Sequence, residues 1–230
     1  MSAVDLRIAR TGLSVPSDAV EALNAGELIL LASSQANRGR GRSVLCGVAA
    51  LMTDLTVVQM VIHGGGLVSI SVDPQTAFQL GLRRMPGMRS RPQEGEYLVS
   101  IEASSCRGTG ISAKDRATTL RAAGALDASQ DDLVMPGHVM PLLVRGHVAR
   151  GSGLPEFAHG IVARNTEYVV PAWCDVLGPE GELAELDRSL ALAQHLGLRA
   201  VVSEECLTAN PYIDSKTADA PIARGDWVRV

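Results

Sequence analysis

The chain carries one stretch in which a histidine is fixed between two prolines, Met135-Pro136-Gly137-His138-Val139-Met140-Pro141-Leu142. Proline fixes the backbone φ angle and glycine permits a turn or a close backbone approach, so this stretch predicts a stiff bend that presents one imidazole. A rigidly held imidazole can act as a general acid or base near neutral pH. For an isolated histidine, burial against a backbone carbonyl is the favoured alternative, so the surrounding sequence has to decide.

Composition limits the classes of protein to consider. The 230 residues are 46% hydrophobic and 20% charged, which suits one globular domain with a core of Val, Leu, Ile and Ala. The net charge of -4 argues against a nucleic-acid-binding protein. The chain shows neither a signal peptide nor an apolar run long enough to cross a membrane. Its four cysteines form no CxxC pair, which favours buried free thiols and a cytoplasmic protein.

The order of hydrophobic patterns predicts the fold class. Strand-like and helix-like segments alternate without a linker or repeat, so we expect a single mixed α/β domain over residues 1–230. An irregular arm is expected over residues 1–16 and an irregular tail over 211–230. The predicted strands are 28–31, 97–103, 169–176 and 199–202. The predicted helices are 19–25 capped by Asp18, two helices that begin after Thr53 and Ser112, 183–195 ended by Gly197, and a short helix from Ser203.

Two glycine-rich basic segments are candidates for binding an anion. Residues 33–43 contain Arg38, Arg40 and Arg42 and no acid, and residues 145–153 contain a second basic run. Arginines spaced by glycine can fold over a phosphate or carboxylate, but a solvated loop is an equally good interpretation of residues 33–43. That segment is not a P-loop, because it lacks the lysine and the Ser/Thr that follows it.

Motifs in the second half of the chain resemble those of a known enzyme family. The run Gly110-Ile111-Ser112-Ala113-Lys114-Asp115-Arg116 is followed by Pro136-Gly137-His138 and then by Arg150-Gly151. In order and spacing these motifs are similar to those of 3,4-dihydroxy-2-butanone 4-phosphate synthases, over about residues 17 to 208. The resemblance implies that family's α/β fold and a homodimer with its sites near the interface.

The resemblance also implies an activity and a set of site residues. That family is a group of magnesium-dependent lyases that convert ribulose 5-phosphate to a four-carbon ketose phosphate and formate, on the route to riboflavin. His138 matches its essential catalytic histidine, and Asp175 occupies the place of an essential glutamate. The predicted catalytic residues are therefore His138 and Asp175, and the predicted substrate-binding residues are Arg38, Arg40, Arg42, Thr109, Arg150, Gly151 and Ser152.

Two departures from the family pattern concern the metal. The family has an acidic, metal-binding loop where this chain has the three arginines of residues 33–43. Its second metal ligand is a histidine, and this chain has Leu154 there, while the roles of His63, His147 and His159 stay open. Magnesium requires several oxygen ligands, and arginines repel a cation. We therefore expect no metal, with magnesium required only if the family's usual reaction is retained.

Three hypotheses follow, in decreasing order of expectation from the sequence alone. The first is an enzyme repurposed for metal-independent acid–base chemistry on a small anionic substrate, such as enolisation, dehydration, cyclisation or carbon–carbon cleavage, in specialised metabolism. The second is an orthodox synthase with an unusual metal site. The third is a non-catalytic homologue that acts as a binding or scaffold protein.

Overall fold

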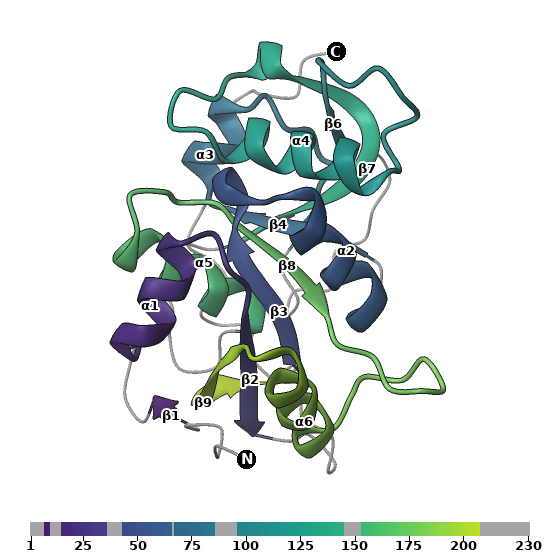
Figure 1. Cartoon of the computed structure of the whole chain (residues 1–230). Coiled ribbons are helices and arrows are strands. Elements are labelled where there is room, and N and C mark those ends of the chain that lie inside the picture. Colours follow the sequence, from purple (N-terminus) through teal and green to yellow (C-terminus); the bar gives the residue numbers. More distant parts are fainter. Residues whose placement is uncertain are drawn as a thin grey trace.

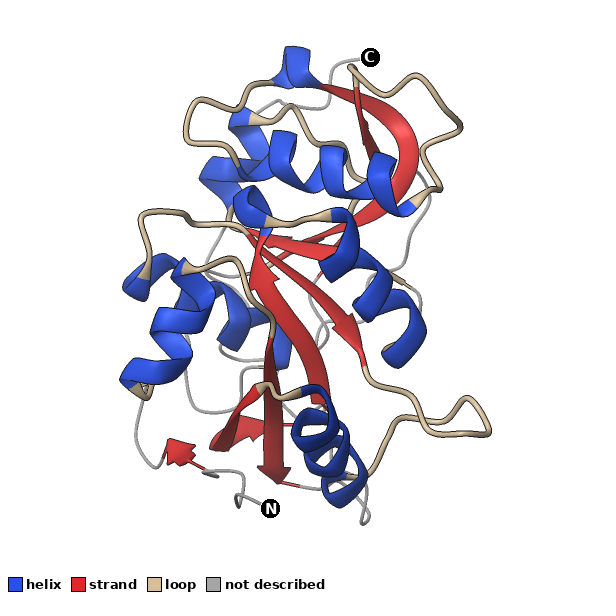
Figure 2. Cartoon of the chain, in the orientation of Figure 1, coloured by secondary structure: helices blue, strands red, loops and turns tan. Residues whose placement is uncertain are grey.

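The computed structural model describes residues 7–9, 15–35, 43–65, 67–85, 96–144 and 153–207 of the chain. They fold into one mixed sheet with helices on both faces (Figures 1 and 2). The strands are β1 (Arg7–Ala9), β2 (Ile29–Gln35), β3 (Ser43–Val48), β4 (Ser69–Val72), β5 (Glu96–Tyr97), β6 (Ile101–Ala103), β7 (Leu133–Leu143), β8 (Pro171–Asp175) and β9 (Arg199–Leu207). The helices are α1 (Ser17–Asn24), α2 (Asp54–His63), α3 (Pro74–Gln79), α4 (Ala113–Gly124), α5 (Leu154–Asn165) and α6 (Leu186–Leu196), with 3-10 turns η1 (Ala49–Leu51) and η2 (Gln130–Asp132).

The strands are ordered β1-β9-β2-β3-β8-β4-β7-β5, and β6 pairs with β7 outside this path. β4 and β7 are parallel, whereas β8 runs antiparallel to both β4 and β3. This order brings the second half of the chain into the middle of the sheet, because β8 lies between β3 and β4. The mixed α/β fold predicted from the sequence is confirmed.

Alternating strand residues build two apolar layers. Leu30 and Leu45 face α2, α4 and α6, whereas their neighbours Leu31 and Cys46 face α1 and α5. Adjacent side chains of a strand point to opposite faces, so a strand covered on both sides is apolar throughout. The thiol of Cys46 is buried in the second layer, and burial raises its pKa to about 12. The predicted burial is confirmed for Cys46 and Cys174, whereas Cys106 is only partly buried.

Three helix ends lie where their capping residues predict them. Thr53 caps α2 through the backbone amide of Thr56, and Ser112 caps α4 through that of Asp115. Gly197 ends α6 in the left-handed conformation, with φ at 68°. No helix in the described part of the chain is long and apolar enough to span a membrane.

Four local predictions are wrong. Asp18 does not cap α1 from the preceding position, because the helix begins at Ser17 and Asp18 instead forms an ion pair with Arg199. The arm at residues 1–16 is not wholly irregular, since β1 pairs with β9 at the sheet edge. No helix begins at Ser203, because β9 continues to Leu207 along β2. The strand predicted at 97–103 is split into β5 and β6. The tail at 211–230 lies outside the described residues.

Candidate functional site

His138 lies in a bulge of β7. Ile101 of β6 pairs with Val139 of β7, but the next residue of β6, Glu102, pairs with Val134. The residues of β7 between these two pairs therefore have no partner in the ladder with β6. Such a bulge re-aims side chains at the edge of a sheet. The stretch predicted as a bend is part of strand β7, so this prediction is wrong. The strand is nevertheless irregular at these residues, because its pairing with β6 shifts there.

Residues in β6 and just before it hold the backbone of the bulge in place. The backbone N–H of Gly137 donates to Oγ of Ser100 at 3.1 Å. Gly137 lies so close to the backbone of Ile101 that a Cβ at position 137 would overlap its carbonyl group. The peptide bond between Met135 and Pro136 is cis. The close backbone approach predicted for Gly137 is confirmed.

The imidazole of His138 has a carboxylate partner that the sequence analysis missed. Nδ1 of His138 lies 3.2 Å from Oε2 of Glu102, and the exposed fractions of the two side chains are 41% and 15%. Gly110, with φ at 80°, leaves the space for this carboxylate, since a Cβ there would overlap it. Thr109 is exposed and directly precedes Gly110, so this predicted substrate-binding residue lies near the pair.

Asp175 lies at the same end of the sheet as His138. Met140, Ser69 and Trp173 form one row across β7, β4 and β8. His138 and Asp175 each lie two residues beyond that row in the same direction, because β8 runs antiparallel to β7. The structure brings the two predicted catalytic residues to one end of the sheet, on strands that flank β4. The imidazole of His138 forms its hydrogen bond with Glu102, while the catalytic roles predicted for His138 and Asp175 stay predictions.

The glycines after His63 form the backbone next to Asp175. A Cβ at Gly64 would lie 2.7 Å from Sγ of Cys174 and 2.8 Å from the carbonyl oxygen of Asp175. The backbone therefore passes tightly against the end of β8 at Gly64. His63 is the last residue of α2 and is half-buried, so the loop places it near the end of β8.

The other predicted binding residues lie outside the described part of the chain. This applies to the arginines of the first basic segment, to the residues of the second and to one histidine of unassigned role: Arg38, Arg40, Arg42, Arg150, Gly151, Ser152 and His147. Their roles stay predictions.

His159 is not part of the candidate site. It lies on α5 with 7% of its surface exposed, and its Nε2 is 3.9 Å from Oδ2 of Asp73. Asp73 follows β4 at the end opposite to the one where His138 lies. Burial lowers the pKa of His159, and the charge of Asp73 opposes this shift. His159 therefore cannot replace a metal ligand beside His138.

The described residues do not fit a magnesium site. The family resemblance implies a metal-binding histidine at the position of Leu154, and the Leu154 side chain is 1% exposed in the apolar layer with Phe157. An aliphatic side chain offers no electron pair to a cation. Within the described ranges, no three His, Cys, Asp or Glu side chains gather in a way that could hold a metal ion.

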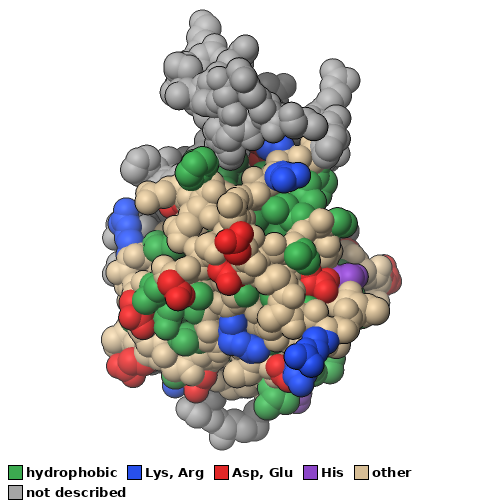
Figure 3. All heavy atoms as spheres, turned by 90° about the horizontal axis from the view of Figure 1, so that it is seen from above, with side chains coloured by type: hydrophobic (Ala, Val, Ile, Leu, Met, Phe, Trp, Pro, Cys, Tyr) green, Lys and Arg blue, Asp and Glu red, His purple; other side chains and the backbone are tan. Residues whose placement is uncertain are grey.

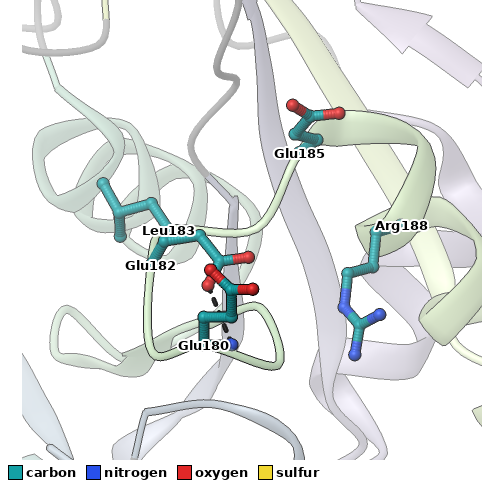
Figure 4. Close-up of a pocket in the computed structure, with 5 residues that line it drawn as sticks. All are labelled: Glu180, Glu182, Leu183, Glu185 and Arg188. Atoms are coloured by element: carbon teal, nitrogen blue, oxygen red, sulfur yellow. Dashed lines mark hydrogen bonds between the residues drawn. The ribbon is translucent and has the colours of Figure 1, made fainter.

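A pocket lies along the loop that follows β8. Glu180, Glu182 and Leu183 line it from the loop after β8, and Glu185 and Arg188 line it from the start of α6 (Figure 4). Three glutamates disfavour an anionic substrate. The face carrying α4, seen from above in Figure 3, has acidic and basic side chains interspersed, without a patch of one sign. Neither surface presents the cluster of positive charge that an anionic substrate would favour.

Comparisons with known proteins identify the family of this chain. Residues 17–208 match the family model of 3,4-dihydroxy-2-butanone 4-phosphate synthase. The chain belongs to this family. It is 29% identical over 206 residues to the 3,4-dihydroxy-2-butanone 4-phosphate synthase of Vibrio harveyi, covering 85% of each chain.

Solved structures of the family share the fold. The synthase of Candida albicans superimposes with a TM-score of 0.72 at 23% identity, covering 81% of this chain and 92% of that one. A synthase solved in complex with two magnesium ions superimposes with a TM-score of 0.69 at 26% identity, covering 81% and 91% of the two chains. The predicted family resemblance is therefore confirmed.

Proposed function

We propose that this dihydroxybutanone-phosphate-synthase-family protein is a lyase that converts ribulose 5-phosphate to 3,4-dihydroxy-2-butanone 4-phosphate and formate. The observation that carries the proposal is the half-exposed imidazole of His138, held on a bulge beside Glu102. The family match over residues 17–208 supports the same reaction. Sequence alone ranks a repurposed enzyme first. The family relatives, which are named as synthases, favour the orthodox reaction instead.

The residues of the site suit the first step of such a reaction. A ketose loses a proton from the carbon next to its carbonyl group, and the electron pair of that C–H bond moves to the carbonyl oxygen to give an enediolate. His138 is placed to take this proton. In this proposal Asp175, at the same end of the sheet, accepts a hydrogen bond from a substrate hydroxyl or moves a second proton.

A second candidate function rests on the metal position. Leu154 is buried where a ligand is required, and the sequence carries Arg38, Arg40 and Arg42 in place of carboxylates. Arginines can stabilise an enolate oxygen without a metal ion. This observation favours metal-independent acid–base chemistry on a small anionic substrate, the interpretation that includes specialised metabolism. Because the donors among the described residues do not fit a magnesium ion, this candidate function assigns the electrophilic role to the arginines.

A formate-release assay with ribulose 5-phosphate tests the proposal. The wild-type protein and a His138→Gln variant are compared with added magnesium and with a chelator. Formate from the wild type alone supports the proposed lyase. Loss of that formate with chelator places the metal ligands in segments outside the described residues, and persistence with chelator supports arginine as the electrophile. No formate from folded protein overturns the proposal and moves the search to other small phosphates and carboxylates.

We also propose that the protein acts as a homodimer in the cytoplasm. Leu55, Val58 and Ile62 form an exposed apolar row on α2, a helix whose only carboxylate is Asp54. The row ends beside the loop that contacts Asp175, so a second copy seated there would lie next to the site. Light scattering should give the mass of a dimer for the wild type and of a monomer for Ile62→Glu. Leu126→Glu, at another exposed leucine, is the control, and a monomeric wild type would contradict the proposal.

A further inference from the structure

Glu102 has a place in the site that neither the family resemblance nor the sequence assigns. Its carboxylate lies between the imidazole of His138 and the backbone of Gly110. It comes from the middle of the short strand β6, whose flanking residues Ile101 and Ala103 are buried. The side chain of Glu102 is only 15% exposed and its carboxylate lies against the backbone of Gly110, so it has few conformations and can fix the orientation of the ring that it contacts.

We propose that Glu102 is a positioning residue that holds His138 in the tautomer with the proton on Nδ1. An ionised carboxylate only accepts hydrogen bonds, so a contact of 3.2 Å with Nδ1 requires the proton to be on Nδ1. In a neutral imidazole the other nitrogen then carries the free electron pair. Nε2 is therefore the atom that takes the proton from substrate. The role of Glu102 in catalysis rests on the proposed function, whereas the tautomer of His138 does not depend on it.

The relative exposure of the two side chains assigns their roles. The side chain of His138 is 41% exposed, whereas that of Glu102 is 15% exposed. A substrate arriving from solvent meets the imidazole before it meets the carboxylate. Glu102 thus acts through His138, in the way that a carboxylate behind a histidine fixes its tautomer and orientation in other enzymes.

Strand β6 fixes both the backbone and the side chain of the bulge. Ser100, just before β6, accepts a hydrogen bond from the backbone N–H of Gly137. Glu102 accepts a hydrogen bond from the ring of the next residue, His138. Between them, the carbonyl of Ile101 lies against Gly137. Three consecutive residues therefore set the backbone position, the approach distance and the ring orientation of His138. Proton transfer is sensitive to all three.

Nitrogen-15 NMR of histidine-labelled protein tests the tautomer directly. Spectra are recorded at a pH at which the imidazole is neutral, and the signals of His138 are assigned by their loss in His138→Gln. The wild type should show protonated Nδ1 and unprotonated Nε2. Glu102→Ala should remove this preference, whereas Glu96→Ala should leave it unchanged, because Glu96 pairs with Arg84. A wild-type His138 protonated on Nε2, or an unchanged tautomer in Glu102→Ala, overturns the proposal.

Kinetics separate this inference from the proposed function. With ribulose 5-phosphate, Glu102→Ala should lower kcat by about 10- to 100-fold with little change in KM. Glu102→Asp, which keeps the charge, should recover part of that loss. If the wild type has no activity on this substrate, the proposed function fails while the NMR result still decides the role of Glu102. A change in KM alone, with kcat unchanged, contradicts the positioning role.

Discussion

Gly137 of β7 lies directly against the carbonyl group of Ile101 of β6, at the point where the pairing of the two strands shifts. The histidine that follows Gly137 is the best candidate for the catalytic base of this protein. The position of His138 thus depends on the absence of a side chain one residue earlier.

We expect Gly137→Ala to destabilise the protein by roughly 1–3 kcal/mol, because the new methyl group would overlap backbone that cannot move aside freely. Activity should fall with it, since the bulge must shift. Gly153→Ala is the control, because a Cβ there meets mainly the flexible end of Glu156. Urea unfolding of both variants measures the difference, and equal free energies of unfolding would contradict this account.

Removal of the hydroxyl of Ser100 should affect the same bulge more mildly. Ser100→Ala removes the acceptor of the Gly137 N–H, which costs about 0.5–1.5 kcal/mol, because this part-buried N–H can bind water instead. Ser100→Thr keeps an acceptor oxygen and should retain most of the stability and activity. Thermal unfolding and formate release are the measurements. A Ser100→Ala variant with wild-type kcat would show that this hydrogen bond does not position His138.

Asp175 offers a test of the predicted carboxylate at the end of β8. Asp175→Asn removes the charge and should lower kcat/KM by about 100-fold or more if the residue moves a proton or orients the substrate. Asp175→Glu restores the longer acid that the family resemblance implies and should keep or raise activity. Steady-state kinetics of both variants give the answer, and equal activity of Asp175→Asn and the wild type would remove Asp175 from the site.

His159 should make the protein less stable in acid. Its pKa is lowered in the folded state by burial, relative to the ordinary value of 6.5, with Asp73 opposing the shift. His159 therefore binds a proton more readily in the unfolded chain than in the folded protein. Its contribution to the free energy of unfolding is fully present above pH 6.5 and is lost as the pH falls through the pKa of His159 in the folded protein. Free energies of unfolding in urea at about pH 7.5 and about pH 5.5 should differ more for the wild type than for His159→Asn. An equal decline for both proteins would contradict this assignment.

Local chemistry made several features of the fold predictable. Thr53, Ser112 and Gly197 mark helix ends through groups within a few residues of each other, so the sequence contains the whole interaction. The apolar strand at residues 28–31 needs only its own pattern to be recognised as buried. Prediction failed where the partner of a segment is distant in sequence. The strand predicted to end at residue 202 continues to Leu207, because β9 pairs with β2 along that length.

The candidate site divides in the same way. His138 could be named from the sequence because it belongs to a short motif with proline and glycine neighbours, and Thr109 because it precedes a motif of the family. Glu102 was missed because it stands in an ordinary strand pattern, Ile101-Glu102-Ala103, with no local sign of function. Its meeting with His138 depends on a register shift between two strands.

The sequence by itself determined the family, the mixed α/β class, the histidine on its proline–glycine support and the substitution of leucine at position 154. These follow from residue identity and spacing along the chain. Only the tertiary structure decided that Glu102 is the partner of His138, that Asp175 lies at the same sheet end, and that His159 lies at the other. Strand order and register set these distances, and the cross-strand hydrogen bonds that fix register join residues that are distant in sequence.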